Sequence, residues 1–129
     1  MATTSTPTHL TGVGTVGIPT RDQDRALDFY GRVLGFETLM DAEFAPGMRW
    51  IELAPAGSPT TLALAPTLPE APVGIDTGIR LSTTDASSDY EALRAAGVSV
   101  GDFLPEPVPM FTFQDPDGNT LYIVERPEA

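Results

Sequence analysis

The chain contains no cysteine and no lysine, and its only histidine is His9. Without cysteine it has no disulfide, no thiolate metal site and no cysteine nucleophile. Without lysine it has neither a Schiff-base amine nor the phosphate-binding lysine of a Walker motif. No apolar run approaches the roughly 20 residues that a membrane-spanning helix requires, so we expect no membrane-embedded segment.

Positive charge is also scarce. Seven basic residues stand against 18 acidic ones, which gives a formal net charge of −11 at pH 7. Such a charge repels polyanions, so we expect neither nucleic acid nor an anionic membrane surface as a partner. The first ten residues have no basic start followed by an apolar stretch, and so they do not have the pattern of a secretory signal. We therefore expect a cytoplasmic protein.

The sequence does contain an internal repeat. Residues 22–35 place apolar side chains at i, i+3 and i+4, with Asp22 able to cap the start of a helix and Gly35 able to end it. Residues 85–97 repeat this plan. Alternating strand patterns precede each predicted helix and follow it, namely residues 16–18, 48–53 and 60–65 in the first half and 79–81, 110–114 and 119–124 in the second. Each half therefore predicts a βαβββ unit.

With 129 residues, 41% of them hydrophobic, the chain has room for one domain with a core. We predict a flexible N-terminal tail over residues 1–11 and a single domain over residues 12–126. Within that domain, the first repeat covers 12–66, a proline-rich linker 67–74 and the second repeat 75–126. The predicted fold class is α+β, in which two βαβββ repeats form a curved mixed sheet around a cup.

Three stretches resemble the vicinal oxygen chelate superfamily, which includes glyoxalase I, extradiol dioxygenases and bleomycin-resistance proteins. They are residues 18–36, 48–57 and 113–125, and the resemblance covers roughly residues 12–126. It implies the glyoxalase/bleomycin-resistance/dioxygenase fold and a homodimer. It does not imply a substrate, because this scaffold serves many chemistries.

Enzymes of that superfamily hold a divalent cation with a histidine on the first strand of one half, a glutamate on its last strand, and comparable positions in the other half. The resemblance assigns these positions to Thr15, Ala63, Gly78 and Tyr122. None of them supplies the imidazole or carboxylate that such a cation prefers. We therefore expect the cup to hold no metal and no other cofactor.

Strand alternation predicts which side chains line the cup. The second half is aligned on the first so that Phe111 and Phe113 correspond to Trp50 and Glu52. The predicted ligand-binding residues are Thr15, Trp50, Glu52, Ala63, Gly78, Arg80, Phe111, Phe113 and Tyr122. Trp50 is either a stacking surface for a ring or part of the core. Arg80 either pairs with Glu52, reaches the rim, or holds an anionic or carbonyl group of a ligand beside Tyr122.

These features predict a small-molecule-binding protein of the resistance or sequestration type, with an aromatic or drug-like ligand in the cup. Two enzymatic alternatives remain open. A metal could be bound by atypical ligands, for which His9, Glu52 and Asp76 are the reserves. Alternatively, Glu52 or Tyr122 could act as the catalytic proton-transfer group in a metal-free reaction of a biosynthetic pathway.

Overall fold

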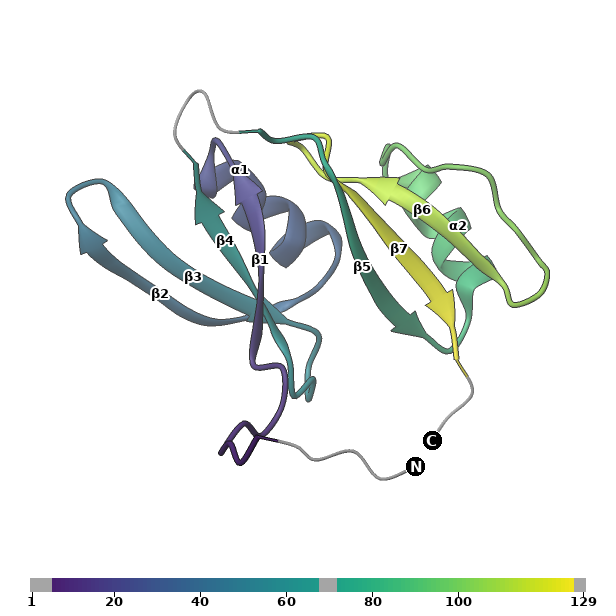
Figure 1. Ribbon diagram of the computed structural model, residues 1–129. Helices are drawn as coiled ribbons and strands as arrows, with labels where there is room; N and C mark the ends of the chain where they lie inside the picture. The colour runs from purple at the N-terminus through teal and green to yellow at the C-terminus, as the bar shows by residue number, and fades with distance from the viewer. Residues whose placement is uncertain (1–5, 68–71, 127–129) are drawn as a thin grey trace.

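The computed structural model describes residues 6–67 and 72–126, which fold as two repeats (Figure 1). The first repeat contains β1 (Thr15–Thr20), α1 (Gln23–Asp28), the π-helical turn η1 (Phe29–Val33), β2 (Glu37–Ala45), β3 (Met48–Ala54) and β4 (Thr61–Pro66). The second contains β5 (Asp76–Thr83), α2 (Ala86–Ala95), β6 (Met110–Gln114) and β7 (Thr120–Glu125). The predicted α+β class with two related halves is confirmed.

The strands form two sheets rather than one continuous curved sheet. Sheet A has the order β1-β4-β3-β2, and sheet B has the order β5-β7-β6. In each sheet the first strand of the repeat pairs in parallel with the last, and the remaining pairs are antiparallel. Each sheet is therefore mixed, and the two repeats share one topology.

The helices begin and end where the sequence predicts. The carboxylate of Asp22 accepts a hydrogen bond from the backbone N–H of Arg25, and that of Asp85 accepts one from Ser88. Gly35 and Gly97 follow the helices with φ of +78° and +83°, a left-handed conformation that favours glycine. Within the described residues, neither helix is long and apolar enough to cross a bilayer.

The second repeat departs from the predicted βαβββ plan, because only two strands follow α2. The segment that would form the missing strand makes two isolated bridges, Val100 with Phe113 and Leu104 with Met110. Three prolines within residues 105–109 remove the backbone N–H groups that a continuous ladder requires. Of the predicted tail and linker, residues 1–5 and 68–71 lie outside the described residues.

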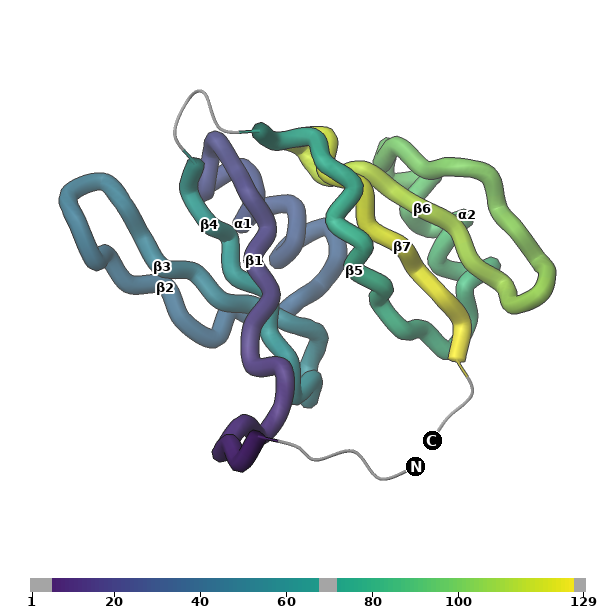
Figure 2. Tube along the Cα trace, viewed as in Figure 1, coloured from purple at the N-terminus to yellow at the C-terminus, as the bar shows by residue number. Residues whose placement is uncertain are grey.

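One hydrophobic core spans both repeats. Figures 1 and 2 show the repeats side by side, with β1 and β5 at the boundary. The rings of Phe29 from η1 and Phe113 from β6 lie 6.1 Å apart, which joins the two halves of the core. Further buried members are Ile18, Tyr30, Ile51, Leu53, Leu62, Leu64, Leu93, Phe111, Leu121 and Ile123. Because these core-facing side chains meet, the opposite face of each sheet is turned away from the core; we call it the outer face.

The turn between β6 and β7 links the repeats through Asn119, which is fully buried. Its amide nitrogen donates to the carbonyl of Pro19 at 2.8 Å, and its amide oxygen accepts from the backbone N–H groups of Gly74 and Ile75 at 2.9 and 3.2 Å. One side chain thus fixes the end of β1, the start of the second repeat and its own turn.

Asp115 extends this link to the first helix. Its carboxylate accepts hydrogen bonds from the Tyr30 hydroxyl at 2.9 Å and from the backbone N–H groups of Asp117 and Asn119. Burial raises the pKa of the Tyr30 phenol, and the Asp115 charge raises it further, so the hydroxyl keeps its proton and remains a donor. We call Tyr30, Asp115 and Asn119 the turn network.

We expect Asn119→Ala to lower the free energy of unfolding by about 3 kcal/mol, because it leaves two backbone N–H groups and a carbonyl without partners. The measurement is urea denaturation followed by circular dichroism. The control is Gln114→Ala on the same hairpin, whose exposed side chain should matter by no more than about 0.5 kcal/mol. Equal losses in both variants would contradict a linking role for Asn119.

Candidate functional site

The outer face of sheet A carries a polar cluster centred on Glu52. As strand alternation predicts, Ile51 and Leu53 are buried while Trp50 and Glu52 lie on the opposite face. Glu52 accepts hydrogen bonds from the indole N–H of Trp50 at 2.6 Å and from the hydroxyl of Thr61 at 2.8 Å. Thr15 lies opposite Thr61 in the parallel ladder and approaches the same carboxylate at 3.5 Å. We call Thr15, Trp50, Glu52 and Thr61 the Glu52 cluster.

These contacts keep Glu52 ionised. The indole N–H of Trp50, followed by the hydroxyl of Thr61, holds the pKa of Glu52 below its ordinary value of 4.5. A carboxylate with a lowered pKa is a weaker base near neutral pH. The cluster is therefore better suited to presenting a fixed negative charge than to removing a proton.

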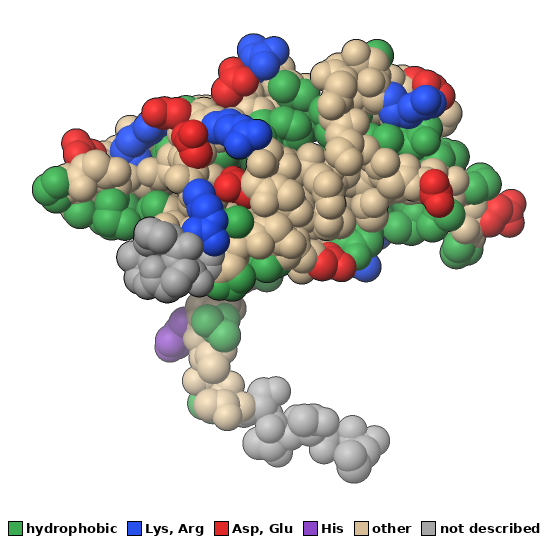
Figure 3. All heavy atoms as spheres, turned by 90° about the horizontal axis from the view of Figure 1, so that it is seen from above, with side chains coloured by type: hydrophobic (Ala, Val, Ile, Leu, Met, Phe, Trp, Pro, Cys, Tyr) green, Lys and Arg blue, Asp and Glu red, His purple; other side chains and the backbone are tan. Residues whose placement is uncertain are grey.

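Apolar side chains surround this charge. Met40 lies opposite Glu52 on the neighbouring strand, and Met48 lies on the same face of β3 as Trp50. Met40, Met48 and Trp50 are 49%, 37% and 39% exposed. Figure 3 shows hydrophobic side chains at the end of the molecule that the β2–β3 hairpin forms. An ionised carboxylate thus lies beside an accessible aromatic and thioether surface.

The outer face of sheet B carries a second cluster, of Asp76, Gly78, Arg80 and Tyr122, which we call the Tyr122 cluster. The guanidinium carbon of Arg80 lies 4.3 Å from the centre of the Tyr122 ring, and one of its nitrogens donates to the Gly78 carbonyl at 2.7 Å. The Tyr122 hydroxyl donates to Asp76 at 2.7 Å. This hydrogen bond raises the pKa of Tyr122 and lowers that of Asp76, so the phenol is a weaker acid than usual.

Phe111 and Phe113 do not lie on the outer face, and this part of the prediction is wrong. They pair with Ile123 and Leu121 in the β6–β7 ladder and are 1% and 0% exposed in the core. Thr112 lies opposite Tyr122 instead. The predicted alignment of the repeats was displaced by one residue on this strand, and a one-residue shift moves every side chain to the other face.

Two residues on the outer faces of the sheets were not predicted from the sequence. Thr61 bonds both Glu52 and the hydroxyl of Thr15, and Thr112 occupies the position assigned to a phenylalanine. The β6–β7 turn could have revealed Thr112, because counting outward from a hairpin gives the register of both strands. Nothing comparable marks Thr61, since the register of a parallel pair is not fixed by a local turn.

Within one chain, the predicted residues outside the core form two clusters on different sheets rather than one lining. Ala63 belongs to neither cluster: it lies opposite Glu52 in the β3–β4 ladder and is 2% exposed. A cavity of about 720 Å³ lies between the repeats and takes in Gly78 and Arg80 but not Trp50 or Glu52. Its other side consists of residues from β1, β4 and the turn over residues 55–60. Among the described residues, no ion pair joins Arg80 to Glu52; the Arg80 guanidinium instead contacts Tyr122 and Gly78.

The four positions that the resemblance assigns to metal ligands do not fit a divalent cation. The hydroxyl of Thr15 is hydrogen-bonded to Thr61 at 2.8 Å, that of Tyr122 donates to Asp76, and Ala63 and Gly78 have no donor atom in their side chains. Across residues 6–67 and 72–126, no three histidine, aspartate or glutamate side chains come together as a metal site. The alternative metal ligands considered above lie in three separate places: His9 before β1, Glu52 on sheet A and Asp76 on sheet B.

Comparison with known proteins places the chain in one superfamily. The family model described as Glyoxalase/Bleomycin resistance protein/Dioxygenase superfamily matches residues 12–123. The uncharacterized protein YetH of Bacillus subtilis (strain 168) is 30% identical over 119 residues, which cover 88% of this chain and 97% of YetH.

Two solved structures share the whole fold. One is TnmS3, an antibiotic binding protein from Streptomyces sp. CB03234, with a TM-score of 0.82 and 31% identity over 94% of this chain and 100% of TnmS3. The other is a superfamily member from Sphaerobacter thermophilus DSM 20745, with a TM-score of 0.82 and 34% identity over 91% of this chain and 98% of that one.

We expect Trp50→Phe to raise the pKa of Glu52 toward 4.5, because the variant loses the indole donor. The measurement is a carbon-13 NMR titration of the Glu52 carboxyl. Ionised Glu52 stabilises the fold above about pH 4.5, and this contribution is lost as the pH falls through the lower pKa of the folded state. The variant should therefore lose less stability on acidification than the unmodified chain. Thr60→Val, which removes a hydroxyl bonded to Val13 instead, should leave the Glu52 pKa unchanged.

Proposed function

The chain belongs to the glyoxalase/bleomycin resistance protein/dioxygenase superfamily, and from this premise we propose that it binds and sequesters a small aromatic or drug-like molecule without a metal. The observation that carries the proposal is which side chains lie on the outer faces of the two sheets. Positions that would hold metal ligands carry Thr15, Ala63, Gly78 and Tyr122, and an exposed indole stands beside a fixed charge. TnmS3, an antibiotic binding protein that shares this fold, is in keeping with the proposal.

The two clusters define the chemistry of the proposed ligand. Trp50 offers a flat surface for a ring, and its N–H is already bonded to Glu52, which fixes the orientation of the indole. The Glu52 carboxylate retains free lone pairs for an N–H or O–H group of the ligand. Arg80 uses one nitrogen for Gly78 and has further donors for a carbonyl or anionic group. A planar molecule with a donor at one end and an acceptor at the other fits this set.

We further propose that the binding unit is a homodimer. β2 is the edge strand of sheet A, and eight of its nine residues are exposed. Leu39 and Phe44 on this strand are 56% and 59% exposed. Long apolar edges are usually covered, and large exposed apolar patches mark interfaces. A second copy whose sheet B faced this sheet A would unite a Glu52 cluster and a Tyr122 cluster in one pocket. The expected cytoplasmic location remains part of the proposal.

Ligand binding can be followed by the fluorescence of Trp50, the single tryptophan of the chain. We expect at least one member of a panel of aromatic natural products and bleomycin-type glycopeptides to change the emission saturably. Arg80→Ala should weaken that binding about tenfold or more, because a charged hydrogen bond is lost. Arg32→Ala, which removes an exposed arginine paired with Asp28, should bind as the unmodified chain does. A panel without a saturable response, or equal effects of both variants, would contradict the proposal.

The homodimer can be tested by sedimentation velocity. We expect the unmodified chain to sediment as a dimer and Phe44→Glu to sediment as a monomer, because a buried unpaired charge opposes association. Leu104→Glu is the matched control, since Leu104 is also exposed, at 49%, but lies in the second repeat away from β2. Sedimentation of the unmodified chain as a monomer would refute the homodimer and leave the ligand proposal to its own test.

A further inference from the structure

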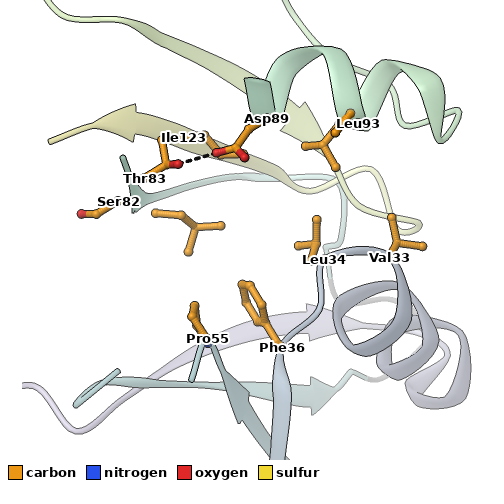
Figure 4. A pocket seen from close by; sticks show the side chains of 11 residues that line it. Val33, Leu34, Phe36, Pro55, Ser82, Thr83, Asp89, Leu93 and Ile123 are labelled. Carbon is orange, nitrogen blue, oxygen red and sulfur yellow. Dashed lines mark hydrogen bonds between the residues drawn. The ribbon is translucent and has the colours of Figure 1, made fainter. Parts of the chain in front are cut away.

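A second cavity, of about 250 Å³, lies between the helices of the two repeats, apart from both polar clusters. Figure 4 shows Leu34 and Phe36 of the first repeat extending toward Asp89 and Leu93 of α2. Ile123 of β7 lies at the back of the same space. None of the residues predicted to bind the ligand lines this cavity, although it adjoins the larger cavity at Pro55, Leu81 and Ser82.

Asp89 is the one charged residue among those that line the cavity. The hydroxyl of Thr83 donates a hydrogen bond to one of its carboxylate oxygens. Within the described part of the chain, the other oxygen has no hydrogen bond and the carboxylate has no ion pair. A molecule that covered this carboxylate without donating a hydrogen bond to it would remove it from water without compensation, which is unfavourable. A suitable occupant therefore supplies an N–H or O–H donor, and a positively charged N–H group is the strongest such partner for a carboxylate.

We propose that this cavity binds a small amphipathic amine. Its ammonium group would donate to the free oxygen of Asp89, and its apolar part would pack against Leu34, Phe36, Leu93 and Ile123. The cavity is smaller than the roughly 300–1,000 Å³ of drug-sized sites, so the amine is a single-ring or short-chain molecule. One carboxylate is too few to hold a metal ion, whereas the net charge of −11 favours organic cations over anions.

This proposal does not depend on the proposed ligand function, because the cavity is lined by no residue of the Glu52 cluster or the Tyr122 cluster. The test is NMR titration with 2-phenylethylamine and, in parallel, with the uncharged 2-phenylethanol. We expect the amine to shift the methyl signals of Leu34, Leu93 and Ile123 saturably, with the alcohol binding at least about tenfold more weakly. Asp89→Asn should remove the preference for the amine. The absence of saturable shifts, or equal binding of amine and alcohol, would overturn the proposal.

A matched pair of variants on α2 separates binding from folding. Ala92 lines the cavity, whereas Ala95 is exposed on the same helix and does not line it. Ala92→Phe should fill the space and weaken amine binding at least about tenfold, and Ala95→Phe should leave it unchanged. Equal binding by the two variants would overturn the assignment to this cavity, even if Asp89→Asn does not fold. Loss of ligand binding in Arg80→Ala, with amine binding retained, would show that the two sites are distinct.

Discussion

The arrangement of the two repeats depends on one buried carboxamide. Asn119 is hydrogen-bonded at once to the end of β1, to the chain entering β5 and to Asp115 of its own turn. A buried amide keeps its hydrogen-bond geometry, because losing a partner away from water raises the free energy of the folded state. Tyr30 adds the first helix to the same group. Asp115 and Asn119 of this turn therefore hold the two repeats together.

Because the core-facing side of each sheet packs against the helix of its own repeat, the outer faces are free to differ. At equivalent places in the repeats, sheet A carries threonine and alanine where sheet B carries glycine and tyrosine. The result is an acidic, thioether-rich face around Glu52 and a face with a cation stacked on an aromatic ring around Tyr122. One topology thus presents two surfaces with different side chains, as expected of a scaffold whose function lies in grafted sites.

Much of the fold could be predicted because it is encoded locally. Caps, helix-ending glycines and the alternation around Trp50 each depend on neighbouring residues, and the structure confirms them. The errors arose where distant segments decide the outcome. Phe111 and Phe113 alternate as well as any strand, but only their pairing with β7 determines which face is buried. Likewise, no local sequence pattern indicates that Thr61 pairs with Thr15. Nor does any local pattern indicate that the two clusters lie on different sheets.

The parallel pairing of β1 with β4, and of β5 with β7, has a consequence for how the chain acquires its structure. In each repeat the first strand pairs with the last one, so neither sheet can form completely until almost the whole repeat has been synthesised. Pairings between such distant segments form slowly. During synthesis the first repeat emerges before the residues of the second repeat that contact it, namely Phe113, Asp115 and Asn119. The part of its core that faces the second repeat stays uncovered until those residues leave the ribosome. Between those two events the growing chain exposes apolar surface that the finished fold buries, which favours aggregation.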